Sequence, residues 1–239
     1  ISEICIQKAD CAIGRRIGDR KMSGYVVVDL EMCKVPQAMR SRYPWGRETI
    51  QIGAVLLNEQ LEITGQFDTF VYPQFGSIDA EIKKLTGIEK KDVKNAPDMK
   101  TALEQFVAWV PRDAAVVSWS DNDEKQIRHE AEAKQIEIQG LDAILENWID
   151  CQKIFSEKMQ TEKCYKLSDA LIATDICYSE REHDGLMDAY NTALLFAKMK
   201  KEQKLQLNAY YRTAREEEEE HLKVELGDLF AGLHIDSGV

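Results

Sequence analysis

The 239-residue chain has no apolar run near the ~20 residues that a membrane-spanning helix needs, and no signal-like apolar segment near its start. Its six cysteines are dispersed: none form the close pairs of a zinc site, and they are too few for a disulfide scaffold. These absences exclude a membrane span, a zinc module and a disulfide-stapled domain. We therefore expect a soluble protein with free thiols in a reducing cytoplasm.

Positive charge is also in deficit, with 31 Lys and Arg against 42 Asp and Glu and a formal net charge of −11. A protein that grips nucleic acid through its whole surface is usually basic. If this chain acts on a polyanion, the attraction must be local. A basic loop, or metal ions held by some of the carboxylates, would supply it.

Three segments of the chain differ in composition. Residues 1–23 are polar and mildly basic, and we expect a leader there, with Met22 as a candidate native start behind added or unprocessed sequence. Residues 24–200 carry the organised apolar pattern and are predicted to form one domain. Residues 201–239 are strongly charged and include the run Glu216–Glu220, so we expect a solvated helical extension.

Within residues 24–200, an initial group of strand signals is followed by alternating strand and helix signals. β-branched or apolar runs predict strands at 25–31, 49–58, 62–73, 114–118 and 148–150, the second and third joined as a hairpin. Periodic runs with capping residues predict helices at 78–85, 98–110, 121–134, 168–173 and 184–200. This order predicts an α/β fold with a mixed five-stranded sheet flanked by helices.

The first candidate site is the triplet Asp29-Leu30-Glu31, at the end of the most apolar predicted strand. A second Asp-x-Glu triplet, Asp79-Ala80-Glu81, lies in a polar helical segment, where a solvated face explains it. Residues i and i+2 of a strand share a face, so Asp29 and Glu31 project side by side. Adjacent carboxylates beside a core repel unless a cation separates them, and a divalent metal is the economical explanation. A strand edge that reaches solvent is the alternative.

Further polar residues lie at two predicted helix starts. Asp121 with Glu124 is typical of a capping box, which leaves Asp123 able to point toward the acidic pair on the first strand. His183 precedes a helix capped by Asp184, and a second carboxylate follows it at Asp188. A helix cap, a favourable helix dipole or an unremarkable loop histidine would each explain one of these features alone.

Together these motifs form an ordered set: Asp-x-Glu on the first strand, an Asp at the turn after the fourth strand, and His-x4-Asp opening a late helix. The set resembles the DEDD superfamily of 3′–5′ exonucleases, in the branch whose fifth residue is histidine. The resemblance covers about residues 24 to 199. Supporting segments that match in order are Glu48–Val55, Leu85–Ile88 and Leu167–Leu171.

Some details separate the chain from the proofreading members of that superfamily. Those members usually have Thr where this chain has Cys33, and His-Asn ahead of the third acid, where this chain has Ser118-Trp119-Ser120. The Trp-Ser-Asp-Asn-Asp turn and the long loop before Arg47 are similar to the RNA-processing branch. That branch includes enzymes that trim small interfering RNA and histone message ends, and bacterial relatives linked to sporulation control.

The resemblance implies a ribonuclease H-like fold and a 3′–5′ exonuclease that releases nucleoside 5′-monophosphates from single-stranded nucleic acid, RNA favoured over DNA. It implies two Mg²⁺ or Mn²⁺ ions, a cofactor that suits phosphodiester hydrolysis and carboxylate ligands. The implied metal ligands are Asp29, Glu31, Asp123 and Asp188, with His183 as the general base. Whether Asp121 or Asp123 is the third acid stays open. The implied partners are 3′ ends of single-stranded RNA or DNA, and a homodimer or protein partner through the C-terminal helix stays open.

The loop Lys34–Arg47 is the predicted substrate-binding segment, because it holds four cations and the first acid after them is Glu48. Its cations would neutralise phosphates, and an aromatic ring would stack a base. The candidate contacts are Arg40, Arg42, Tyr43, Trp45 and Arg47. The alternative is a loop that is basic by chance and folds over the core through Trp45.

Two other functions compete with the exonuclease. One is a catalytically silent nucleic-acid-binding or regulatory protein with the same fold, acting through the acidic C-terminal helix. The other is a Mg²⁺-dependent phosphohydrolase that is not a nuclease. The intact set of four acids and a histidine argues against the first, since a site freed from catalysis could lose any of them.

Overall fold

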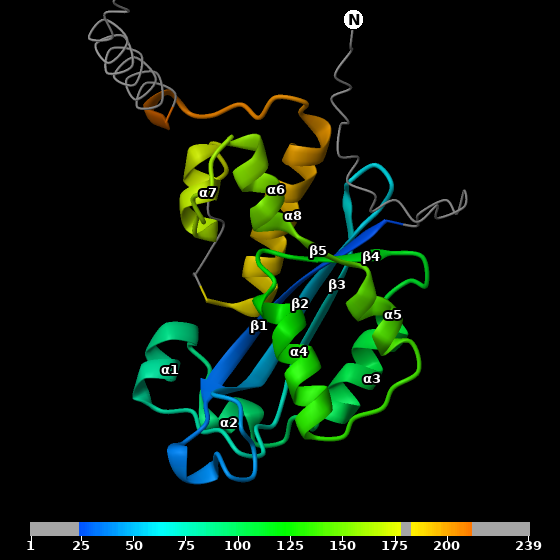
Figure 1. The fold of residues 1–239 in the computed structure, drawn as a ribbon, viewed down its shortest axis with the longest axis vertical. Coiled ribbons are helices and arrows are strands. Elements are labelled where there is room, and N and C mark those ends of the chain that lie inside the picture. The colour runs from blue at the N-terminus through cyan, green and yellow to red at the C-terminus, as the bar shows by residue number, and fades with distance from the viewer. Residues whose placement is uncertain (1–23, 178–182, 212–239) are drawn as a thin grey trace, which may run out of the picture.

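The computed structural model describes residues 24–177 and 183–211. The predicted leader and the run Glu216–Glu220 lie outside these residues. A five-stranded sheet in the order β3-β2-β1-β4-β5 forms the centre of the fold (Figure 1). Its strands are β1 (Tyr25–Lys34), β2 (Arg47–Leu57), β3 (Ile63–Phe70), β4 (Ala115–Ser118) and β5 (Trp148–Asp150). β1 pairs antiparallel with β2 and parallel with β4, so the predicted mixed sheet is confirmed.

Helices cover both faces of the sheet and one of its ends (Figure 1). The first five are α1 (Ala80–Thr86), α2 (Lys90–Val93), α3 (Met99–Trp109), α4 (Asn122–Ala133) and α5 (Leu141–Glu146). The last three are α6 (Cys151–Lys158), α7 (Leu167–Ala173) and α8 (Gly185–Lys201). A short 3-10 turn, Gln37–Met39, lies in the loop between β1 and β2. None of the described helices is long and apolar enough to cross a membrane.

Alternation along β1 divides the core into two layers. Val26, Val28 and Leu30 pack in one cluster with α3, α4 and α5, whereas Val27 packs in the other with α6, α7 and α8. Because successive strand residues point to opposite faces, Asp29 belongs to the same side as Val27, under α8. The sheet therefore directs Asp29 toward the start of α8.

Two glycines allow α8 to approach the sheet closely. A Cβ added to Gly53 on β2 would overlap the backbone of Gly185 and Leu186 at the start of α8. A Cβ on Gly185 would lie 3.2 Å from the backbone oxygen of Asp29 and 3.3 Å from Oε1 of Gln51. A side chain at Gly53 would displace the start of α8, and one at Gly185 would make a tight contact with β1, so glycine at both positions favours the close approach.

Two predicted local structures are wrong. Among the described residues, the Asp121 carboxylate caps no backbone N–H and instead pairs with Lys125 at 2.8 Å, so the capping box with Glu124 does not form. The helical extension predicted from residue 201 does not form at 202–208, where the chain turns back along α6 and α7. There the amide of Asn208 donates to the carbonyl of Ile172, and this bond favours the turn over a continued helix.

Candidate active site

Asp29 and Glu31 lie on β1, beyond the part of the strand that pairs with β4. β4 pairs with residues 25 to 27 of β1, so the edge of β1 that faces α4 is open from there on. Glu31 is 7% exposed although it carries a carboxylate. The two acids lie on a buried strand as predicted, but within it and not at its end, because β1 continues to Lys34.

Asp123 enters the same region from the first turn of α4. Its Oδ1 accepts a hydrogen bond from the backbone N–H of Leu30 at 3.1 Å, and its side chain is buried. This N–H lies past the end of β4, and a buried donor without a partner would be costly. The carboxylate satisfies it and is thereby held beside Asp29. Asp121, in contrast, is 40% exposed and faces Lys125, so the geometry favours Asp123 as the third acid.

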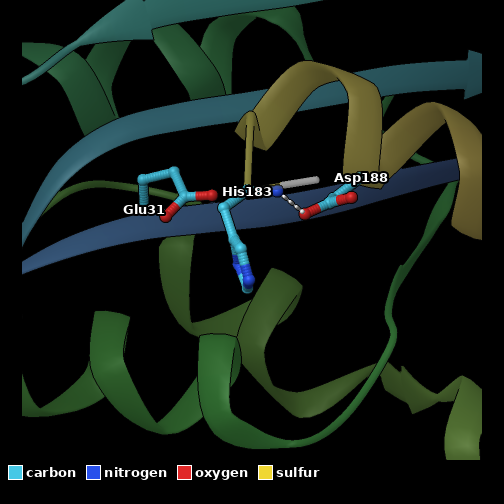
Figure 2. A group of neighbouring side chains, drawn as sticks. All are labelled: Glu31, His183 and Asp188. Carbon is cyan, nitrogen blue, oxygen red and sulfur yellow. Dashed lines mark hydrogen bonds between the residues drawn. The ribbon is translucent and has the colours of Figure 1, made fainter. Parts of the chain in front are cut away.

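His183 and Asp188 reach the site from the start of α8, where Asp184 is the N-cap. The Asp184 carboxylate accepts from the backbone N–H groups of Leu186 and Met187, as the sequence predicted. His183 has a left-handed backbone with φ of 64°, and its N–H donates to Oδ2 of Asp188 at 3.0 Å. Figure 2 shows His183 between Glu31 on β1 and Asp188 on α8. One potential ligand atom from each of these three residues lies within 4.8 Å of the others.

The clustered carboxylates raise one another's pKa. Burial, followed by the charges of Asp123, Asp188 and Glu31, raises the pKa of Asp29 well above its usual range. Burial, followed by the charge of Asp188, raises the pKa of Glu31 to about 8. The pKa of Asp123 is raised to about 7 chiefly by burial, although its bond from the Leu30 N–H opposes this change. The raised pKa values show that the acids predicted from separate motifs share one electrostatic environment.

The donor set fits a divalent cation. Carboxylate oxygens are the preferred ligands of Mg²⁺, and Mn²⁺ also accepts an imidazole. Without a cation, at least some of these buried acids must stay protonated or repel one another at neutral pH. A bound divalent ion would remove that cost and draw the acids into their charged forms. The residues that could hold it are Asp29, Glu31, Asp123 and Asp188.

These raised pKa values predict that the metal-free protein is more stable at mildly acidic pH than at pH 8. Between the ordinary carboxyl range and about pH 8, folded Glu31 binds a proton that the unfolded chain releases, so stability falls as pH rises through this window. Every tenfold difference in proton affinity between the folded and unfolded chain changes the free energy of unfolding by about 1.4 kcal/mol. The melting temperature in EDTA should therefore fall by roughly 5 °C or more between mildly acidic pH and pH 8. Thermal melts across the window, with and without Mn²⁺, measure this.

Glu31→Gln is the matched control for this prediction, because it removes the titrating proton and keeps the side-chain volume. The variant should show a flatter melting profile, and Mn²⁺ should raise the melting temperature of the wild type at pH 8. A wild-type melting temperature that rises from mildly acidic pH to pH 8 in EDTA would contradict the assignment.

Two of the predicted substrate contacts instead hold the Lys34–Arg47 loop together. Tyr43 is 0% exposed, its ring stacks on Phe75, and its hydroxyl donates to the carbonyl of Arg47 at 3.0 Å. The prediction that Tyr43 stacks a base is therefore wrong, because its ring faces lie inside the protein. Arg40 donates to the carbonyls of Val35 and Pro44, both at 3.3 Å, and so braces the loop.

The remaining loop candidates are more open. Arg42 and Arg47 are exposed, with the Arg42 guanidinium 5.7 Å from the centre of the Phe75 ring. Trp45 is half-buried and stacks on His129 of α4, with ring centroids 3.5 Å apart. The amide of Gln126 also donates to the carbonyl of Arg47. Helix α4 therefore contacts the end of the loop and also contains Asp123. The contact of these residues with a substrate stays a prediction.

Sequence reasoning missed two residues of the site. Asp184 was expected only as a cap, yet its charge also contributes to the raised pKa values of Asp29 and Glu31. Gln51 lies in the matching segment Glu48–Val55 but was assigned no role, although it is a polar residue within the otherwise apolar run Ile50–Leu57. Its amide lies 3% exposed between β3 and α8. A polar side chain at the centre of a buried strand was the available signal.

Comparison with known proteins covers most of the described chain. The model of the family described as Exonuclease (RNase_T) matches residues 26–196. ERI1 exoribonuclease 2 of Danio rerio is 28% identical over 204 residues, which cover 75% of this chain and 35% of that protein. The 3′-5′ exonuclease Snipper of Drosophila melanogaster is 26% identical over 210 residues, covering 77% of this chain and 72% of that protein. This chain spans about a third or less of the length of the ERI1 exoribonuclease 2 relatives it matches.

A solved structure shares the fold. The nuclease domain of 3′hExo, described as a DEDDh family member bound to rAMP, matches with a TM-score of 0.67 at 21% identity. The match covers 80% of this chain and 98% of that one. It confirms the ribonuclease H-like arrangement of sheet and helices predicted from the sequence.

Proposed function

The chain belongs to the Exonuclease family, as its motifs predicted, and from this premise we propose that it hydrolyses single-stranded nucleic acid from the 3′ end, RNA in preference to DNA. The products are nucleoside 5′-monophosphates. The RNA preference is supported by the names of two relatives, an exoribonuclease and a nuclease domain bound to rAMP. The 3′ polarity is supported by the name of the Drosophila relative.

The observation that carries this proposal is the convergence of four acids and one histidine from β1, α4 and α8. Asp29, Glu31 and Asp188 would hold one divalent ion, and Asp29 with Asp123 would hold a second. Bound divalent ions supply a nucleophilic water at neutral pH and stabilise the charge that develops on the leaving oxygen. Glu31, Asp123 and Asp188 are buried, and bound cations would favour their charged forms.

His183 is the proposed general base. It is exposed, so its imidazole is accessible to solvent water, whereas Glu31, Asp123 and Asp188 are buried. Its backbone bond to Asp188 fixes the position of the residue without using the imidazole nitrogens. The ring can therefore accept the proton of the attacking water while the backbone stays anchored.

The substrate strand would run over the exposed cations of the β1–β2 loop. We expect Arg42→Ala combined with Arg47→Ala to raise KM and to reduce the slope of log KM against log salt by roughly 1.4, the effect of two lost phosphate contacts. Arg40 is left unchanged because it braces the loop. Steady-state kinetics on a single-stranded oligomer over a salt series measure this.

Arg112→Ala is the control for non-specific charge, since Arg112 is exposed in the turn between α3 and β4. That variant should keep the wild-type salt dependence. An Arg42/Arg47 variant with the wild-type KM and salt slope would remove this loop from the substrate path.

The proposed function is tested with 5′-labelled single-stranded RNA and matched DNA, incubated with Mg²⁺, Mn²⁺ or EDTA. A ladder that shortens from the 3′ end only when metal is present supports it, and the faster substrate identifies the preferred sugar. An oligomer labelled at its 3′ end should release the terminal nucleotide first, which distinguishes an exonuclease from another phosphohydrolase. Intact oligomers with protein that still binds Mn²⁺ would support a silent nucleic-acid-binding or regulatory protein instead.

A further inference from the structure

Gln51 lies in β2 beside the acids of the site. In the antiparallel pairing of β1 and β2 it is directly opposite Glu31, and opposite residues of such a pair share a face. It is 3% exposed, whereas its neighbours Ile50 and Ile52 are apolar and fully buried. An amide at such a position must find hydrogen-bond partners to offset the cost of its burial.

Both ends of the Gln51 amide have partners on other elements. Its Oε1 accepts from the backbone N–H of Gly185 at 3.2 Å, and its Nε2 donates to Oδ1 of Asp68 on β3 at 2.9 Å. A backbone N–H can only donate and an ionised carboxylate can only accept. The two partners therefore determine which way the amide faces.

The bond to Gly185 lies where α8 meets the sheet. Gly185 is the first residue of α8 and follows His183 by two positions. Its Cα lies so close to β1 that an added Cβ would be 3.2 Å from the carbonyl of Asp29. A displacement of this residue would move the imidazole of His183 and the carboxylate of Asp188 relative to Asp29.

We propose that Gln51 is a positioning residue that, together with Asp68, holds the start of α8 so that His183 and Asp188 face Asp29 and Glu31. This inference rests on the proposed function. It extends the site by two residues, Gln51 and Asp68, that are neither proposed metal ligands nor the proposed general base. Packing alone does not require an amide here, because a methionine of similar shape would fill the same space.

Gln51→Met tests the role, because it keeps the volume and removes both hydrogen bonds. We expect kcat to fall about 10- to 100-fold, the size of effect that small misplacements of reacting groups produce. KM for the oligomer should stay near the wild-type value, because Arg42 and Arg47 are untouched. Mn²⁺ affinity, measured by calorimetry, should weaken about 10-fold or more, as for other residues that orient metal ligands.

Two variants of Asp68 and one control sharpen the test. Asp68→Asn keeps an oxygen that can accept from Gln51, so it should retain far more activity than Asp68→Leu, which removes the acceptor. Gln66→Met changes an exposed residue of the same strand and should behave as the wild type. All assays are run below the melting temperature of each variant, as measured by circular dichroism.

The outcomes separate this inference from the proposed function. A Gln51→Met protein with a lower melting temperature but unchanged kcat and Mn²⁺ affinity would show a structural role and overturn the inference, as would equal activity of Asp68→Asn and Asp68→Leu. If the wild type itself does not shorten the oligomer, the proposed function fails. The Mn²⁺ affinities of the same variants then still decide the positioning role.

Discussion

Asp29→Asn is expected to lower kcat by about 10³-fold or more while leaving the protein folded. Metal ions contribute several kcal/mol of transition-state stabilisation in such sites, and about 1.4 kcal/mol corresponds to a tenfold change in rate. Asp29 interacts with all the other acids of the group, so its loss should affect both proposed metal sites. The measurement is single-turnover hydrolysis of a labelled oligomer at saturating Mn²⁺.

The same substitution should stabilise the metal-free protein. Burial and the charges of its neighbours raise the pKa of Asp29, which means that its ionised form is unfavourable in the fold. A neutral amide of the same shape removes that cost. We therefore expect a higher melting temperature in EDTA and a smaller gain on adding Mn²⁺. A variant with wild-type hydrolysis would show that the cluster is not the catalytic centre.

Asp121 and Asp123 provide the matched pair of controls. Both acids lie at the start of α4, two positions apart, but Asp123 is buried against β1 and Asp121 pairs with Lys125 at the surface. Asp123→Asn should therefore abolish hydrolysis, and Asp121→Asn should leave it near the wild-type rate. The reverse result would move the third metal ligand to Asp121.

Strong local patterns account for what could be predicted from the sequence. The five strands and the longer helices follow from apolar periodicity, and Asp184 caps its helix as expected. Helices α2, α5 and α6 were not predicted: α2 and α5 have only four and six residues, and α6 begins directly after β5. The order of the acidic motifs along the chain was sufficient to predict which five residues the fold brings together.

Features that depend on distant parts of the chain could not be predicted. Tyr43 was expected at the surface of a basic loop, but its ring is buried against Phe75, which lies beyond two further strands. The hydrogen bond from Gly185 to Gln51 joins residues 134 positions apart. Asp121 failed as a cap because Lys125 competes for its carboxylate. A tertiary partner changed the expected role of Tyr43 and of Gln51, whereas for Asp121 the partner is a lysine four residues along its own helix.

His183→Asn is expected to reduce kcat by about 10²- to 10⁴-fold, the usual contribution of a general base. Asparagine tolerates the left-handed backbone of this position, and its N–H can still donate to Asp188, so the turn into α8 should be preserved. The neighbourhood of Glu31, His183 and Asp188 also allows the imidazole to act as a metal ligand. Mn²⁺ affinity distinguishes the two roles, because losing a base leaves it unchanged and losing a ligand weakens it.

His183→Gly supplies a second readout on the same question. Glycine also suits a positive φ, and it opens space at an exposed position for free imidazole. If the residue removes a proton from water, added imidazole should restore part of the rate, and the restored rate should rise with the fraction of unprotonated imidazole as pH is raised. A rate that imidazole does not restore, together with weakened Mn²⁺ binding, would reassign His183 to the metal. The backbone N–H of His183 donates to Asp188. Either role of the imidazole therefore depends on the short segment from His183 to Asp188, which the hydrogen bond between Gly185 and Gln51 attaches to β2.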